Sequence, residues 1–216
     1  KDGSAEHQAD VYVCVLDALG ITRAAVLGAS AGGPSAMQFA LRHPDRTQAL
    51  IVLVPAAYAP KPAGEPTMKP SRLRDVFFDT ALRSDFFFWA AAKVASRPLI
   101  RSILGTPPQV VDAASAAEKA RVRMMLDHIL PISARRAGML NDAAVIAALP
   151  RYDLERVTAP TLAISLEDDG YETLPGAKYS AEHIPNARLL SFAAGGHLAV
   201  GHQTEIEDAI VALLKS

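Results

Sequence analysis

The sequence predicts an α/β fold, with a mostly parallel sheet, helices on both faces and an inserted helical lid. A short apolar run over residues 23–28 leads into the spacing G-x-S-x-G at Gly28–Gly32, which is typical of a strand that turns sharply into a helix. The run QALIVLVP, residues 48–55, is almost continuously apolar, as strands buried on both faces are. Strand and helix patterns alternate along the chain, which favours a parallel sheet of at least four strands.

The elements before the proposed lid follow from local signals. Apolar residues recur at helical spacing over residues 5–18, and Gly20 follows as a stop signal. We expect the strand at 23–28 next, and then a helix over 31–42 that Pro44 ends. The run 48–55 is the second strand of this half.

The composition changes after Pro55, where a proline-rich stretch leaves the sheet. Only helical patterns follow until about residue 148, so we expect a core made of residues 1–58 and 151–216 and a lid over 59–150. Aromatic residues gather in this lid. They indicate either helices packed on one another or an aromatic wall over an apolar acyl or alcohol group; they are Phe77, Phe78, Phe86, Phe87, Phe88 and Trp89.

The core pattern resumes after the lid. The run APTLAIS at 159–165 reads as a third strand, and a helix is expected over 174–183. A strand at 187–192, a Gly-Gly loop and an amphipathic helix over 204–215 complete the chain.

Charge and composition narrow the class of partner. The 22 Lys and Arg residues balance 23 Asp and Glu residues, so nothing favours nucleic acid or an anionic membrane, and a small-molecule substrate is expected. The longest apolar stretches are too short to cross a bilayer and are interrupted by Pro55 or Lys93. The single cysteine, Cys14, is expected on the buried face of the first helix, and its isolation is compatible with a reducing, cytoplasmic location.

The serine of the G-x-S-x-G spacing, Ser30, is a candidate nucleophile. A serine hydroxyl needs a histidine to take its proton and a carboxylate to orient that histidine. Ligands of such sheets bind at the carboxyl ends of the strands, so the histidine should follow a strand. His197 does so, after the flexible pair Gly195–Gly196, while His202, at the start of the last helix, is the alternative.

The carboxylate should follow the third strand, where Glu167, Asp168 and Asp169 stand in succession. An acidic run of this kind is otherwise typical of a solvated loop. The order Ser, Asp, His along the chain is nevertheless the order expected where the serine stands in a G-x-S-x-G turn. Asp168, Asp169, His197 and His202 match no recognised metal-ligand spacing, so we expect neither a metal nor a cofactor.

Four ordered segments resemble the α/β-hydrolase superfamily, in particular its lidded members that act on small molecules. The segments are VLGASAGG, RHPDRTQALIVLVPA, APTLAISLEDDG and EHIPNARLLSFAAGGHL. The resemblance implies that Ser30, His197 and Asp169 form a catalytic triad and that the N–H of Ala31 forms half of an oxyanion hole. Leu166 stands where such loops often have glycine, so Asp168 stays open as the acid.

The chain departs from the family at its beginning. Only 29 residues precede Ser30, and they hold one helix and one strand, whereas the family has further strands there and a loop that supplies the second oxyanion donor. We therefore expect the first strand to lie at the sheet edge, covered by a missing N-terminal segment of the same protein. The alternative is a minimal hydrolase whose edge is covered by a dimer mate.

The expected function is hydrolysis of a small, mostly apolar ester or related acyl compound through an acyl-enzyme. The same resemblance also implies two other activities, cofactor-free haloperoxidase or perhydrolase chemistry and hydrolysis of a carbon–carbon bond. A hypothesis of another class is a non-catalytic protein that keeps the lidded site as a receptor.

Overall fold

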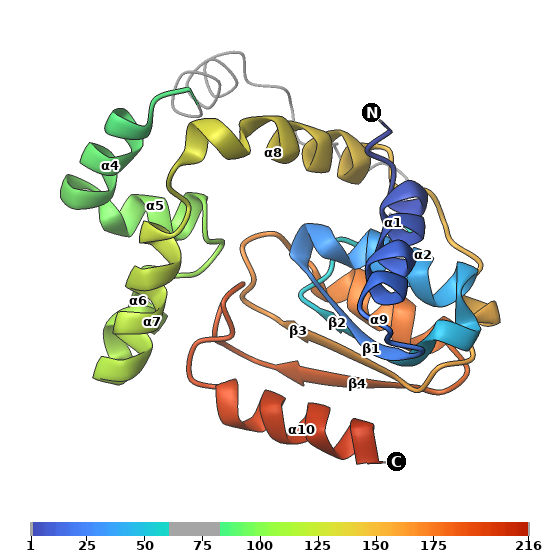
Figure 1. Cartoon of the computed structure of the whole chain (residues 1–216). Coiled ribbons are helices and arrows are strands. Elements are labelled where there is room, and N and C mark those ends of the chain that lie inside the picture. The colour runs from blue at the N-terminus through green and yellow to red at the C-terminus, as the bar shows by residue number, and fades with distance from the viewer. Residues whose placement is uncertain (1, 61–82, 216) are drawn as a thin grey trace.

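The computed structural model describes residues 2–60 and 83–215. Its centre is a four-stranded parallel sheet in the order β1-β2-β3-β4, which confirms the predicted fold class (Figure 1). The strands are β1 (Ala24–Ala29), β2 (Thr47–Leu53), β3 (Thr161–Leu166) and β4 (Ala187–Phe192). Because all four run the same way, their carboxyl ends meet at one end of the sheet.

Helices cover the sheet on both faces. Helices α2 (Gly33–Arg42) and α9 (Leu174–His183) pack on one face, and α10 (Gln203–Lys215) packs on the other (Figure 1). Each face has its own apolar core: Leu50 and Val52 point toward α2, whereas Ile51 and Ile164 point toward α10. This alternation is the period of two expected of strands with two buried faces.

Helix α1 (Ala5–Ala18) packs on α2 rather than on the sheet. It begins at Ser4, whose hydroxyl accepts a hydrogen bond from the N–H of His7 at 3.2 Å. Ala5 and Ala9 are buried, but Cys14 is exposed, so the expectation that it lies on the buried face is wrong. The contact with α2 follows the Ala5–Ala9 side of the helix, and residue 14 lies outside that stripe.

Strand β1 forms one edge of the described sheet and is open on one face. Val26 packs against the core on the α2 side, whereas the alternating positions Ala25 and Ala29 are exposed. Leu27, between them, is 51% exposed. An edge strand with an uncovered apolar face is unusual for a protein in isolation.

Between β2 and β3, every α-helix or strand that the structure describes is an α-helix within residues 83–150, and we call these residues the helical insertion. Its helices are α4 (Asp85–Val94), α5 (Ser96–Ser102), α6 (Pro108–Ala113), α7 (Ala116–Asp127) and α8 (Ile132–Ala147). The short 3-10 helix Leu154–Arg156 follows and leads into β3. In Figure 1 the arrowheads of β3 and β4 point toward this insertion.

The insertion has a core of its own, centred on Phe88, Leu126 and Ile132. Of the aromatic residues singled out in the sequence, Phe88 is buried there, whereas Phe86 is 75% exposed and stacks on Trp89 at the surface. Phe77 and Phe78 lie outside the described residues. Packing of helices on one another thus explains Phe88 but not its exposed neighbours.

Across residues 2–60 and 83–215, none of the helices has the length and apolar character needed to span a bilayer.

Candidate active site

Ser30 stands at the point where β1 ends and the chain turns through a short 3-10 helix, Ser30–Gly32, into α2. Its φ of +50° lies in the left-handed region, which is strained for a residue with a side chain and recurs at functional positions. The turn brings Gly28 so close to Gly32 that a Cβ on Gly28 would lie 2.5 Å from the carbonyl oxygen of Gly32. The strand, turn and helix that the spacing predicted are therefore present around Ser30.

His197 reaches Ser30 from the loop after β4. Its Nε2 lies 2.9 Å from the Ser30 Oγ. The ring of Tyr171 packs edge-on against the imidazole, with 4.8 Å between ring centroids. The two residues that share this hydrogen bond are 167 positions apart in the chain, and the parallel sheet brings them together.

Asp169 lies on the other side of the imidazole. Its two carboxylate oxygens are 2.9 and 3.0 Å from Nδ1 of His197, and its side chain is fully buried. Since an ionised carboxylate can only accept hydrogen bonds, Nδ1 carries the proton and Nε2 is left to accept one from the Ser30 hydroxyl. The structure thus joins the three residues in one hydrogen-bonded row.

Two further groups support Asp169. The N–H of Tyr171 donates to Oδ1 at 2.9 Å, and the hydroxyl of Thr173 donates to Oδ2. Burial by itself would raise the pKa of the Asp169 carboxyl, but the hydrogen bonds from His197 and Thr173 outweigh burial and hold that pKa below its usual value. Asp169 is therefore ionised at neutral pH.

Asp168, which the sequence left open as the acid, faces away from the imidazole. Its carboxylate accepts hydrogen bonds from the N–H of Gly195 at 3.1 Å and of Gly196 at 2.7 Å. It therefore holds the backbone just before His197. The two neighbouring acids support the same histidine, one at its ring and the other at its loop.

His202, the alternative to His197, has other contacts. Its ring stacks on Phe192 at 4.0 Å between centroids, and its Nε2 lies 2.9 Å from the carbonyl oxygen of Ala194.

Ala31 follows Ser30 within the 3-10 helix, the position expected for the oxyanion donor. That role stays a prediction.

Sequence reasoning missed Thr173 and Ser165, whose hydroxyls are 2.8 Å apart below the Asp169 carboxylate. The one available signal was the threonine that directly precedes the helix at Leu174, where hydroxyl residues often lie. Nothing in the sequence pointed to Ser165, because its role depends on the pairing of β3 with the loop that follows it.

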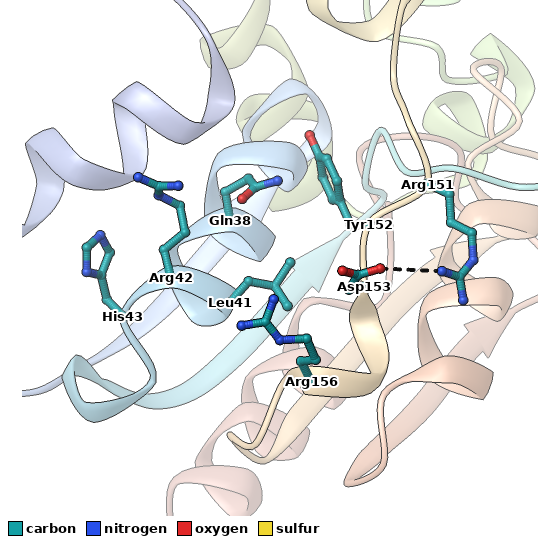
Figure 2. A pocket seen from close by; sticks show the side chains of 8 residues that line it. All are labelled: Gln38, Leu41, Arg42, His43, Arg151, Tyr152, Asp153 and Arg156. Atoms are coloured by element: carbon teal, nitrogen blue, oxygen red, sulfur yellow. Dashed lines mark ion pairs between the residues drawn. The ribbon is translucent and has the colours of Figure 1, made fainter.

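A cavity of about 550 Å³ lies elsewhere, beside residues that precede β2 and β3 (Figure 2). Because the row of three residues follows the carboxyl ends of the strands, this cavity is at the opposite end of the sheet. Two of its three arginines already face acids: Arg42 pairs with Asp10, and Arg151 lies 3.7 Å from Asp153. The cavity is lined by Gln38, Leu41, Arg42, His43, Arg151, Tyr152, Asp153 and Arg156.

Within the described ranges, no three His, Cys, Asp or Glu side chains gather in a way that could hold a metal ion.

Comparisons with known proteins place the chain in a family. Residues 1–201 match the sequence profile of the alpha/beta hydrolase fold. A solved alpha/beta hydrolase fold protein from Nakamurella multipartita superposes with a TM-score of 0.69 at 25% identity, over 98% of this chain and 76% of that one. The chain belongs to the alpha/beta hydrolase fold family.

Two curated relatives are also similar. A putative carbamate hydrolase, RutD, from Caulobacter vibrioides is 28% identical over 97% of this chain and 71% of its own length. A 2-hydroxy-6-oxononadienedioate/2-hydroxy-6-oxononatrienedioate hydrolase from Cupriavidus pinatubonensis is 30% identical over 86% of this chain. The chain spans 59% of the length of this second relative.

Proposed function

We propose that this chain is a serine-dependent hydrolase that acts on a small, mostly apolar ester or related acyl compound. The observation that carries the proposal is the continuous row of hydrogen bonds from the Ser30 Oγ through His197 to the buried Asp169, at 2.9 Å on each side of the imidazole. The strained backbone of Ser30 supports it, because the turn presents the hydroxyl at the carboxyl end of the sheet.

In the proposed mechanism, the Ser30 Oγ attacks the substrate carbonyl carbon while Nε2 of His197 takes the hydroxyl proton. Asp169 stays ionised and stabilises the imidazolium through Nδ1–H. The negative charge that develops on the carbonyl oxygen would accept a hydrogen bond from the N–H of Ala31.

The tetrahedral intermediate then expels the alcohol, which receives the proton from His197, and leaves an acyl group on Ser30. Water attacks this ester while His197 takes a proton from it. The acid is released, and the proton returns to the Ser30 oxygen. The helical insertion, beyond the ends of β3 and β4, would act as the lid of this site.

Both curated relatives are named hydrolases, one of a carbamate and the other of 2-hydroxy-6-oxononadienedioate or its trienedioate analogue. Those names support hydrolysis as the type of reaction.

Labelling with a fluorophosphonate probe tests the nucleophile. We expect a covalent adduct on Ser30 of the wild type, and none on the Ser30→Ala or His197→Ala variants. The matched control is Ser35→Ala, because Ser35 is a buried serine on α2 whose hydroxyl donates a hydrogen bond to the carbonyl oxygen of Gly32 at 3.2 Å and not to His197. A wild type that stays unlabelled, or a His197→Ala variant that labels normally, would favour the receptor hypothesis.

A substrate panel separates the reactions. It contains p-nitrophenyl esters of rising chain length, an aryl carbamate, a vinylogous diketone, and peroxide with acetate. We expect the fastest turnover with a short ester. Turnover of the diketone alone would instead assign carbon–carbon bond hydrolysis, and turnover only with peroxide would assign a perhydrolase.

A further inference from the structure

The turn between α5 and α6, which carries Ile103, Gly105 and Thr106, contacts both loops of the candidate site. The carbonyl oxygen of Gly105 accepts two hydrogen bonds, from the N–H of His197 at 3.1 Å and from the N–H of Gly170 at 2.8 Å. A single atom of the insertion therefore holds the backbone of the histidine and of the residue after Asp169. We call residues 103–106 the crossing segment.

Thr106 adds a second contact with the histidine loop. It is fully buried, and its hydroxyl donates to the carbonyl oxygen of Leu104 at 2.9 Å and accepts from the N–H of Leu198 at 3.2 Å. The residue next to His197 on its C-terminal side is thus also fixed from the insertion. Because Thr106 is buried, removing its hydroxyl leaves the N–H of Leu198 without this partner, which is costly.

The third contact reaches the acid loop. The hydroxyl of Tyr171 donates to the carbonyl oxygen of Ile103 at 2.7 Å, and the N–H of the same residue supports Asp169. The crossing segment is therefore bonded to residues 170 and 171 on one side and to 197 and 198 on the other.

The packing leaves little room in this junction. Gly105 has a φ of +54°, and a Cβ on it would lie 2.6 Å from the Tyr171 ring and 3.0 Å from the Cβ of His197. On the facing loop, a Cβ on Gly196 would lie 2.6 Å from the Cα of Thr106. A side chain at residue 105 has to displace the histidine, the tyrosine or the crossing segment.

We propose that the crossing segment is a positioning element: Gly105 and Thr106 set the distance between His197 and Asp169 from within the helical insertion. This inference rests on the proposed function of Ser30, His197 and Asp169. It assigns to the insertion a part in assembling the catalytic row in addition to covering it. Neither Gly105 nor Thr106 touches the reacting atoms, so both act through the backbone of the loops.

The first test replaces Thr106 by Val, which keeps the shape and removes the hydroxyl. The readouts are the maximal rate of fluorophosphonate labelling at Ser30 and the probe concentration that gives half of it. We expect the maximal rate to fall on the order of tenfold to a hundredfold, because misplacement of a catalytic group by about 1 Å costs that much. The half-saturating concentration should change less than about twofold, since the binding surface is kept.

Two variants calibrate this test. Thr106→Ser restores the hydroxyl and should restore most of the rate. Thr161→Val is the matched control, because Thr161 is also fully buried and its hydroxyl also donates to a carbonyl oxygen two residues earlier, that of Ala159 at 2.9 Å. Thr161 lies at the amino end of β3, so the Thr161→Val variant should be less stable but should be labelled at the wild-type rate.

A spectroscopic readout separates positioning from general destabilisation. The proton that His197 Nδ1 shares with Asp169 should give a low-field NMR signal, which Asp169→Asn removes. We expect Thr106→Val to shift or broaden this signal and Thr161→Val to leave it unchanged.

A second substitution covers the case in which Thr106→Val does not fold. Gly105→Ala should slow labelling at least as much as Thr106→Val. Gly138→Ala, in α8 of the same insertion, should not, because a Cβ there meets nothing within 4 Å.

The positioning role is overturned if Thr106→Val or Gly105→Ala labels at the rate of its matched control, or if the low-field signal is unchanged. These outcomes all presuppose a wild type that labels. A wild type without an adduct at Ser30 would contradict the proposed function itself.

Discussion

Around the loops that follow β3 and β4, the carboxylates of Asp168 and Asp169 and the buried hydroxyl of Thr106 are held by hydrogen bonds, whereas along β1 and α1 large apolar side chains face solvent. Asp168, Asp169 and Thr106 each accept or donate at least two hydrogen bonds. On β1 and α1, Leu27 and Val15 are about half exposed. The loop region is held by many contacts within this chain, and the β1 region lacks a cover among the described residues.

This difference teaches how the site is built. The row of Ser30, His197 and Asp169 needs β1 only for the position of Ser30, which is fixed by the turn into α2 and by the hydrogen bond from the N–H of Ala56 to the Ser30 carbonyl oxygen at 2.9 Å. Ser30, His197 and Asp169 can therefore be joined by hydrogen bonds although the described residues leave β1 uncovered. Three substitutions would break or sharpen the comparison.

The largest effect is expected from Asp169→Asn. An amide at this position can donate to Nδ1 and so stabilise the wrong tautomer of His197, and in a serine protease the corresponding change lowers kcat on the order of 10⁴-fold. The measurement is the rate of fluorophosphonate labelling or of p-nitrophenyl ester hydrolysis at pH 7 and above. A loss below about tenfold would show that Asp169 does not orient the imidazole.

A smaller loss is expected from Asp168→Asn, its neighbour and matched control. Asp168 holds the N–H groups of Gly195 and Gly196 rather than the ring, so the variant should lose about tenfold in kcat/KM, the cost of one weakened charged hydrogen bond. Equal losses of kcat/KM in the Asp168→Asn and Asp169→Asn variants would contradict the different roles inferred for the two acids.

The smallest effect on activity, and a separate effect on association, is expected from Leu27→Lys. We predict that the chain by itself self-associates through β1, because an uncovered edge strand pairs with other strands and a lysine there prevents it. Sedimentation velocity at rising protein concentration measures this. Leu214→Lys is the control, since Leu214 on α10 is exposed to a similar extent, 41%. A chain that is monomeric at every concentration would contradict this prediction.

Much of the fold was predictable because its signals are local. The helix at 174–183 and the strand at 187–192 agree with the structure at both ends, and the first helix ends at Ala18, two residues before the stop expected at about Gly20. Capping residues, prolines and apolar periodicity act on consecutive residues, so they are readable without any tertiary contact. The expectation for Cys14 failed because the direction of a helix face depends on which neighbour it packs against.

The candidate site was predictable in part for a related reason. Ser30 and His197 carry signals in their own glycine-containing loops, and the structure brings them together. Asp168 and Asp169 both follow the third strand in the sequence, and only the path of the loop decides which of the two contacts the imidazole. Thr106 carried no signal, since its partner Leu198 is 92 residues away and a threonine in a turn between two helices is commonplace.

By itself the amino-acid order determined which elements form, in what succession, and which side chains could do acyl-transfer chemistry, because periodicity and turn preference are properties of neighbouring residues. The tertiary structure alone decided which acid meets the imidazole, that the insertion holds both loops of the site, and that β1 forms an edge of the described sheet. These are distances between segments far apart in the chain, and they exist only once the sheet has brought the ends of its strands together.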